Sequence, residues 1–320
     1  MFIAQAFKVK HEFWRYLVGS AIIILASFIG QVPLGLVFVF KGMRDGIDMT
    51  SIDEKTMFTF LEPNLFLFLM LISFVVGMIG LWLVVKYLHR QSMTSITTAR
   101  KKIDWKRIWF SFIFWGVLSS GLVLLDYYLS PEDYVVNFQL KRFVILSVIA
   151  IALIPIQTSL EEYIFRGYLM QGFGMLAKNK WFPLMMTSLI FGGLHLFNPE
   201  VKMLGYSIMI YYIGTGLFLG VLTLMDEGME LSLGFHAANN LFTALLVTSD
   251  WTAFQTHSIL KDVAKPELGF FDMVLPVFVL FPILLFIFSK VYRWTGWKEK
   301  LFGEVTELPK EDYKIVDEIL

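Results

Sequence analysis

The stretch FVILSVIAIALIPIQTSLEEYIFRGYLMQGFGML, at residues 143–176, decides the fold class of this chain. It is apolar over roughly 34 residues, whereas a helix needs only about 20 apolar residues to cross a bilayer. Its apolar residues form one continuous run, not the alternating pattern of a half-buried strand. The pattern predicts a membrane-spanning helix that extends beyond one crossing and holds charged residues within it.

Seven further apolar runs flank this stretch. They cover residues 16–40, 65–88, 108–129, 181–197, 204–225, 229–248 and 273–292. Because the bilayer core has no water to satisfy backbone groups, spanning segments are helices or closed barrels, and these runs do not alternate. We predict an all-α fold, a polytopic membrane helix bundle of about eight transmembrane helices.

Composition supports a membrane protein and excludes several other classes. Of 320 residues, 57% are hydrophobic and 17% are charged, against roughly 25% charged in soluble domains. The 27 basic and 27 acidic residues cancel, which excludes the strong positive charge of a nucleic-acid binder. The chain has no Cys, which excludes disulfides, thiolate metal sites and cysteine nucleophiles.

Basic residues in short loops predict the orientation. The strongest basic cluster follows the second run, and it comprises Lys86, Arg90, Arg100, Lys101, Lys102, Lys106 and Arg107. Since such clusters stay on the cytoplasmic side, we expect both termini to be cytoplasmic. Residues 1–15 lack the organisation of a cleavable leader, so we expect the first span to be retained. A bacterial plasma membrane fits the composition best.

The order of apolar runs and polar segments suggests that the chain has four parts. We expect N-terminal membrane helices and a basic loop at residues 1–142, and a catalytic helix core at residues 143–250. An outer loop and the last membrane helix would follow at residues 251–296, and a polar cytoplasmic tail at residues 297–320.

Ionisable residues inside a span cost several kcal/mol and mark functional sites. Glu162 and Arg166 are four residues apart on one helix face, which predicts an ion pair between them. Glu161 is rotated by about 100° from Glu162, so it points elsewhere and is free to bind water, a metal ion or a proton.

Two other runs carry histidines. His236 and Asn240 are four residues apart, as are Phe191 and His195. One alternative is that all these groups only hold helices together, but interhelical hydrogen bonds in membranes contribute about 0.6 kcal/mol on average. We therefore favour a functional site. For Gln157 and Asn239 we expect only a hydrogen bond to a backbone group or a neighbour.

Together these motifs resemble those of the CPBP family, the CAAX-processing and bacteriocin-processing intramembrane proteases, also called the Abi family. The resemblance covers roughly residues 148–248 and implies that a Glu–Arg pair fixes the helix geometry. The motif residues are Glu161, Glu162, Arg166, Phe191, His195, His236 and Asn240.

The resemblance also implies a mechanism for hydrolysing an amide bond. Glu161 and His195 would hold and deprotonate a water molecule, and His236 and Asn240 would donate hydrogen bonds to the oxyanion. The alternative is a zinc site with Glu161, His195 and His236 as ligands. Because the compact His-Glu-x-x-His arrangement is absent, we favour the mechanism without a metal.

The expected function is that of an intramembrane endopeptidase. Its substrate would be a membrane protein or peptide, with or without a lipid, and the bilayer itself would be a partner. A catalytically silent scaffold or immunity-type protein of the same fold is a second hypothesis. A proton-coupled transporter is a third, although the repeats and interrupted helices typical of transporters are not evident.

Overall fold

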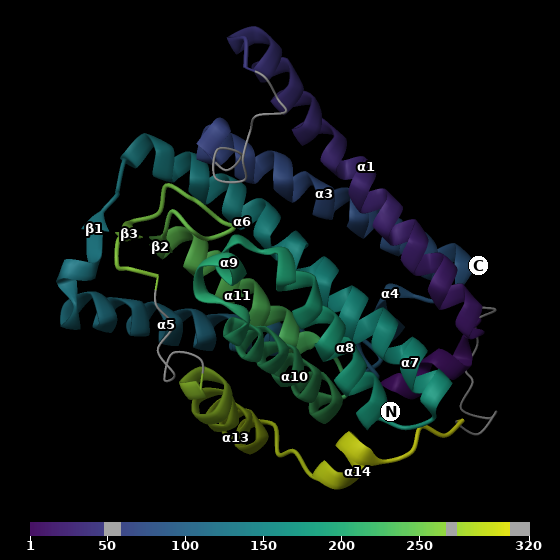
Figure 1. Ribbon diagram of the computed structural model, residues 1–320. Coiled ribbons are helices and arrows are strands. Elements are labelled where there is room, and N and C mark those ends of the chain that lie inside the picture. The colour runs from purple at the N-terminus through teal and green to yellow at the C-terminus, as the bar shows by residue number, and fades with distance from the viewer. Residues whose placement is uncertain (48–58, 267–273, 308–320) are drawn as a thin grey trace.

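The computed structural model describes residues 1–47, 59–266 and 274–307, and the bundle is built almost entirely from helices (Figure 1). The α-helices are α1 (Phe13–Asp45), α3 (Pro63–Leu83), α4 (Met93–Thr97), α5 (Trp105–Leu129), α6 (Leu140–Glu162), α7 (Met170–Ala177), α8 (Trp181–Gly193), α9 (Pro199–Leu204), α10 (Met209–Asp226), α11 (Glu230–Leu246), α13 (Phe281–Val291) and α14 (Trp297–Phe302). The 3-10 segments are η1 (Ile3–Lys8), η4 (Pro131–Asp133), η6 (Leu194–Phe197) and η7 (Tyr206–Ile208), and the π-helical segments are η3 (Val84–Leu88), η5 (Tyr163–Leu169) and η8 (Leu275–Leu280).

The predicted helical, multi-pass membrane fold is confirmed. Among the residues that the structure describes, five helices are long and apolar enough to cross a bilayer, namely Phe13–Asp45, Pro63–Leu88, Trp105–Leu129, Leu140–Ala177 and Tyr206–Asp226. The apolar helices Trp181–Phe197 and Leu275–Val291 are shorter. The run predicted at residues 229–248 forms α11, which has 17 residues and is largely buried by its neighbours.

The helix that decides the fold extends beyond one crossing, as predicted. α6, η5 and α7 form one helical segment of 38 residues, Leu140–Ala177. The π-helical turn η5 begins directly after Glu162. Such turns widen a helix locally and are frequent at functional sites.

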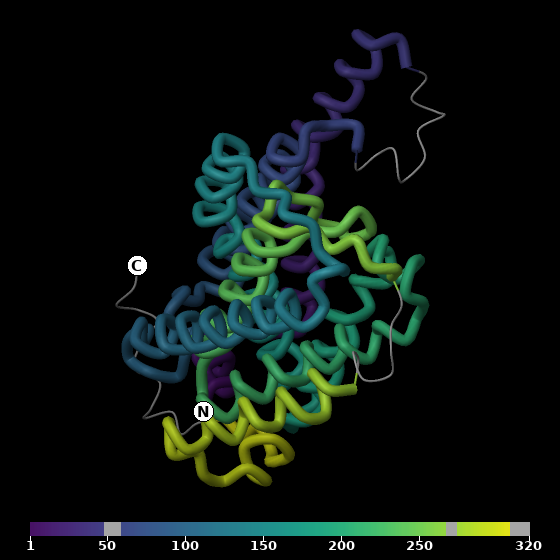
Figure 2. Tube along the Cα trace, turned by 90° about the vertical axis from the view of Figure 1, so that its left-hand side faces the viewer, coloured from purple at the N-terminus to yellow at the C-terminus, as the bar shows by residue number. Residues whose placement is uncertain are grey.

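Helix α11 lies in the interior of the bundle, where it packs against α5, α6 and α10. Its contact with α5 is close because Gly234 has no side chain. A Cβ at Gly234 would lie 2.1 Å from the carbonyl oxygen of Ile108 and 2.2 Å from Oγ of Ser111. On one side of the bundle α1 packs on α3 and α3 on α6, and elsewhere α8 packs on α10. The end of α1 projects from the rest of the bundle (Figure 2).

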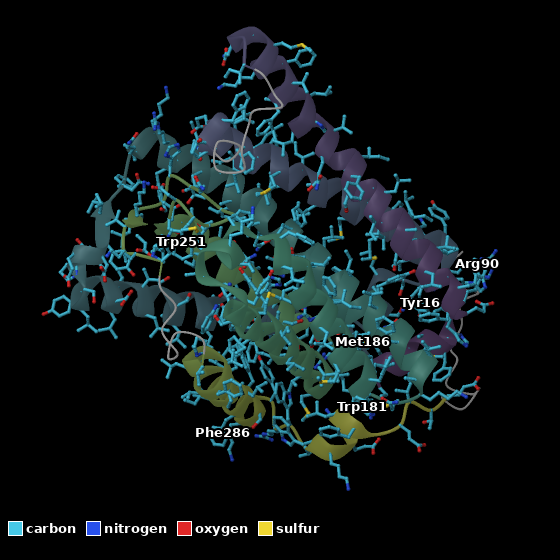
Figure 3. The ribbon with its side chains drawn as sticks, viewed as in Figure 1. Tyr16, Arg90, Trp181, Met186, Trp251 and Phe286 are labelled. Atoms are coloured by element: carbon cyan, nitrogen blue, oxygen red, sulfur yellow. The ribbon has the colours of Figure 1, made fainter. Side chains whose placement is uncertain are left out.

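A small sheet at one end of the bundle was not predicted. Its order is β1 (Tyr134–Val136), β3 (Leu260–Asp262), β2 (Val247–Thr248), with β3 antiparallel to β1 and parallel to β2. β1 and β3 fall between the predicted apolar runs, whereas β2 takes up the last two residues of the run predicted as a helix at residues 229–248. Strands of two or three residues are too short to show an alternating pattern. Trp251 lies near this end, and Arg90 and Tyr16 lie toward the opposite one (Figure 3).

The first residues and the last described residues lie together at the end opposite the sheet. Phe2, Ile3 and Val305 are buried in one apolar cluster. At the same end Arg100 binds Glu230 at 3.0 Å and Asp226 at 2.9 Å, which joins the loop before α5 to the turn between α10 and α11. Contacts at this end therefore fix the position where α11 begins.

Candidate functional site

The polar residues singled out in the sequence come from three parts of the bundle. Glu161 and Glu162 end α6, and Arg166 lies in η5. His236 and Asn240 lie on α11, and His195 lies in η6 after α8. The packing of α6 against α11 is what brings the acids and His236 together.

Glu162 and Arg166 form the ion pair that their spacing predicts. Oε1 of Glu162 lies 2.9 Å from Nη1 of Arg166, and both side chains are fully buried. Nη2 of Arg166 donates to the carbonyl of Gly216 at 3.1 Å, and the guanidinium carbon lies 4.5 Å from the centroid of the Phe191 ring. Arg166 therefore ties α6 and η5 to α8 and α10.

His236 lies between the two acids. Its Nδ1 is 2.8 Å from Oε1 of Glu162. Because a carboxylate that is paired with Arg166 only accepts hydrogen bonds, Nδ1 carries the hydrogen. Nε2 lies 3.5 Å from Oε2 of Glu161. The ring of His236 thus connects a buried, fixed carboxylate to a second carboxylate that is free of an Arg partner.

Glu161 is the accessible member of the acidic pair. Its side chain is 20% exposed, whereas that of Glu162 is 0% exposed. Nε2 of Gln157 donates to Oε1 of Glu161 at 2.6 Å, and Nδ2 of Asn240 donates to Oε1 of Gln157 at 3.2 Å. Gln157 therefore links Asn240 to Glu161, whereas from the sequence we expect only one hydrogen bond to a backbone group or a neighbour. Its spacing of four residues from Glu161 is the feature of the sequence that indicates the contact between these two residues.

His195 adjoins this cluster through an aromatic ring. Its Nδ1 lies 2.8 Å from the carbonyl oxygen of Phe191, so Nδ1 is the donor and Nε2 remains free in the neutral ring. The His195 ring stacks on Tyr212, with centroids 4.3 Å apart, and lies 4.9 Å from the Phe191 ring. The Phe191 ring is 6.1 Å from that of His236. Nothing in the apolar run around Tyr212 indicated its contact with His195.

The zinc alternative requires Glu161, His195 and His236 to converge on one point. Within residues 1–47, 59–266 and 274–307, no group of three or more His, Asp or Glu side chains is arranged to hold a metal ion. The three residues therefore do not form a ligand set in this geometry.

The helices and the buried Glu162–Arg166 pair define a helical, multi-pass membrane protein with a polar cluster inside the bundle. Residues 139–242 match the family described as type II CAAX prenyl endopeptidase Rce1-like, and the chain belongs to this family. The chain is 31% identical over 240 residues to the uncharacterized protein YyaK of Bacillus subtilis (strain 168). That alignment covers 75% of this chain and 79% of the relative. No solved structure matches the chain. The predicted family resemblance is confirmed, and all six site residues lie within the matched range.

Proposed function

We propose that this protein is an intramembrane endopeptidase that hydrolyses a peptide bond of a membrane-associated protein or peptide. The observation that supports the proposal is that two adjacent acids differ in burial and in their partners. Glu162 is fully buried and bound to Arg166, whereas Glu161 is partly accessible and close to His236. One carboxylate is a structural anchor, and its neighbour can reach a water molecule.

Glu161 acts as the general base in this proposal. Gln157 holds one of its oxygens at 2.6 Å, and the second oxygen remains available to accept a hydrogen bond from water. As the water attacks the substrate carbonyl, its proton passes to Glu161 and then to the nitrogen of the leaving amine. His195 assists with its free Nε2, because the Phe191 carbonyl holds its Nδ1 as the donor.

His236 and Asn240 stabilise the oxyanion in this proposal. With Nδ1 of His236 bound to Glu162, Nε2 is the ring atom that can face the substrate, and in the imidazolium form it carries the hydrogen that the oxyanion would accept. One hydrogen of the Asn240 amide is used on Gln157, which leaves its second hydrogen for the substrate oxygen. A donor of this kind contributes about 10²- to 10³-fold to the rate of acyl transfer.

Family membership and the membrane helices support a substrate that is itself in or on the membrane. The basic residues around Lys101 favour an orientation with both termini in the cytoplasm. In that orientation the cluster Arg100–Asp226–Glu230 lies on the cytoplasmic side, and a bacterial plasma membrane is the proposed location.

Liposomes containing the purified protein would test the proposal. Peptides ending in a Cys-aliphatic-aliphatic-X sequence would be presented with and without a prenyl group, and a membrane peptide extract would be the third substrate. We expect new peptide termini by mass spectrometry, and Glu161→Gln should reduce their rate of formation by about 10²- to 10⁴-fold.

The matched control is Glu132→Gln, which neutralises an exposed acid in η4, outside the site. It should cleave at the rate of the unchanged protein. Cleavage by Glu161→Gln at the unchanged rate would contradict the mechanism. No cleavage of any of the three substrates by the unchanged protein would favour the scaffold hypothesis.

A further inference from the structure

We propose that Trp115, Asn239 and Gln157 are positioning residues that aim the Asn240 amide and hold the Glu161 carboxylate through a one-way chain of hydrogen bonds. This inference rests on the proposed function, and it assigns roles to three residues outside the family motifs. The chain crosses three helices, since Trp115 lies on α5, Asn239 and Asn240 on α11, and Gln157 and Glu161 on α6.

Four hydrogen bonds make up this chain. Nε1 of Trp115 donates to Oδ1 of Asn239 at 3.1 Å, and Nδ2 of Asn239 donates to Oδ1 of Asn240 at 3.2 Å. Nδ2 of Asn240 donates to Oε1 of Gln157 at 3.2 Å, and Nε2 of Gln157 donates to Oε1 of Glu161 at 2.6 Å. Every residue between the two ends accepts one bond and donates the next.

The two ends of the chain fix its direction. An indole nitrogen can only donate a hydrogen bond, so Asn239 must present its oxygen to Trp115. The Asn239 amide nitrogen then faces Asn240, which must also present its oxygen. At the other end an ionised carboxylate can only accept, which requires the nitrogen of Gln157 to face Glu161. Both ends therefore demand the same orientation of all three amides.

This direction has a consequence for Asn240. Rotating its amide by 180° would place its nitrogen against the nitrogen of Asn239 and its oxygen against the oxygen of Gln157. Two hydrogen bonds would be lost in a site where Gln157 is 3% exposed, and unpaired polar groups there are costly. These hydrogen bonds therefore fix the second N–H of the Asn240 amide on the side that faces neither Asn239 nor Gln157.

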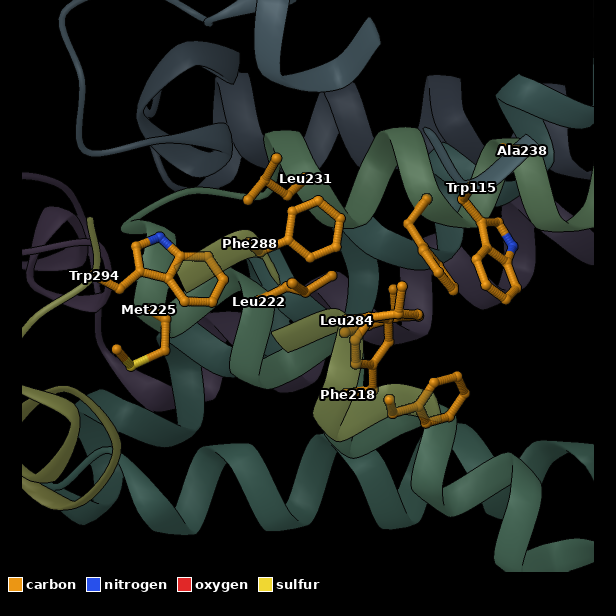
Figure 4. Close-up of a cluster of buried hydrophobic side chains, with 12 residues drawn as sticks. Trp115, Phe218, Leu222, Met225, Leu231, Ala238, Leu284, Phe288 and Trp294 are labelled. Atoms are coloured by element: carbon orange, nitrogen blue, oxygen red, sulfur yellow. The ribbon is translucent and has the colours of Figure 1, made fainter. Parts of the chain in front are cut away.

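Trp115 is itself held in place by packing. It is 6% exposed, stacks on Phe235 with ring centroids 4.5 Å apart, and belongs to a buried apolar cluster beside α11 (Figure 4). A donor fixed by its own packing is a suitable anchor for the first hydrogen bond. α5 thus contributes to a site formed otherwise by α6, α8 and α11.

Asn239→Asp tests the direction of the chain in reconstituted liposomes. The carboxylate still accepts from Trp115 but cannot donate to Asn240, so the Asn240 amide loses the partner that orients it. We expect kcat to fall by about 10- to 100-fold, the usual effect of removing a residue that orients a catalytic group, with KM changed by less than about twofold. Trp115→Phe should also lower kcat, and the two changes together should be no worse than Asn239→Asp alone.

Asn179→Asp is the matched control. Oδ1 of Asn179 accepts from the backbone nitrogen of Phe182 at 2.9 Å, at the start of α8, and a carboxylate can make the same bond. This variant should retain the kcat of the unchanged protein. A normal kcat in Asn239→Asp, or an additive loss in the double variant, would overturn the one-way chain.

A second measurement does not depend on cleavage. The indole N–H signal of Trp115 in the NMR spectrum, assigned with Trp115→Phe, should shift in Gln157→Met, although Gln157 lies two hydrogen bonds beyond Asn239. An unchanged signal would overturn the chain whether or not a substrate has been found. If Glu161→Gln is inactive while Asn239→Asp is fully active, the positioning role of the hydrogen-bond chain is wrong and the proposed function stands. If Glu161→Gln retains full activity, the proposed function fails.

Discussion

Nδ1 of His236 and Nη1 of Arg166 bind the same oxygen of Glu162, at 2.8 Å and 2.9 Å. This single atom therefore joins α11 to the helical turn that follows α6. The three side chains lie in the interior of the protein, since Glu162 and Arg166 are fully buried and His236 is 5% exposed. The position of His236 relative to Glu161 depends on this shared oxygen.

Removing Arg166 should destabilise the protein strongly. Arg166→Met leaves the Glu162 carboxylate buried without its cation, and we expect the free energy of unfolding to fall by about 3–5 kcal/mol. Denaturant titration in detergent micelles would measure the change.

The control is the double variant Glu162→Gln with Arg166→Met, which removes both charges. Since replacing a buried ion pair as a whole is often close to neutral, much of the lost stability should return. A double variant that is less stable than Arg166→Met would contradict this account. Cleavage should remain low in the double variant, because there His236 has lost its anionic partner Glu162.

Gly234 is required for the approach of α5 to α11. In Gly234→Ala the new Cβ would meet the carbonyl oxygen of Ile108 at 2.1 Å, so one helix must move. We expect a loss of about 1–3 kcal/mol in the free energy of unfolding, together with reduced cleavage, because Trp115 and Asn239 meet across the same contact.

Gly121→Ala is the matched control on α5. A Cβ at Gly121 would have no neighbour within 4 Å, and alanine favours a helix over glycine by about 1 kcal/mol. This variant should be as stable as the unchanged protein or slightly more so. Equal losses in the two variants would show that the α5–α11 contact is not the cause.

The sequence was sufficient for features that lie within one helix. Apolar run length predicted the helical membrane fold and the long α6–α7 segment, and a spacing of four residues predicted the Glu162–Arg166 pair. These follow from helix geometry, which is the same in every helix. The roles proposed for the site residues stay predictions.

Contacts between helices could not be predicted in this way. His236 reaches Glu161 and Glu162 because of how α11 is rotated against α6, and the spacing within either helix does not specify that rotation. The same holds for the stacking of Tyr212 on His195.

Arg100 should stabilise the start of α11. It binds Glu230, whose side chain is 0% exposed, and Asp226, whose side chain is 1% exposed. Arg100→Met leaves Glu230 without its cation. Because Arg100 itself is about a quarter exposed, we expect a loss of about 2–4 kcal/mol in the free energy of unfolding, somewhat less than for a fully buried pair.

Lys101→Met provides the comparison, since Lys101 is exposed and adjacent in the sequence. Its effect on the free energy of unfolding should stay within about 0.5 kcal/mol. Equal losses for Arg100→Met and Lys101→Met in the same denaturant titration would argue against a specific role for the ion pairs.

His89, directly after η3, should make stability depend on pH. Its ring is 0% exposed, Nδ1 donates to the carbonyl of Lys10 at 2.7 Å, and Nε2 lies 2.9 Å from the hydroxyl of Tyr168. Burial lowers the pKa of His89, and the nearby Arg15 lowers this pKa further. The unfolded chain therefore binds a proton at a higher pH than the folded protein does.

The sign of the effect follows from this difference. Above the unfolded pKa of about 6.5 neither state is protonated at His89, and its contribution to stability is complete. As the pH falls below about 6.5 the unfolded state is favoured, until the folded pKa is reached. We expect the midpoint of thermal unfolding to drop between about pH 7 and pH 5. In His89→Asn, whose amide can donate to the same carbonyl without titrating, the drop should be smaller. Lys10→Gln keeps the backbone carbonyl and should behave as the unchanged protein, whereas equal slopes in all three proteins would show that another group causes the pH dependence.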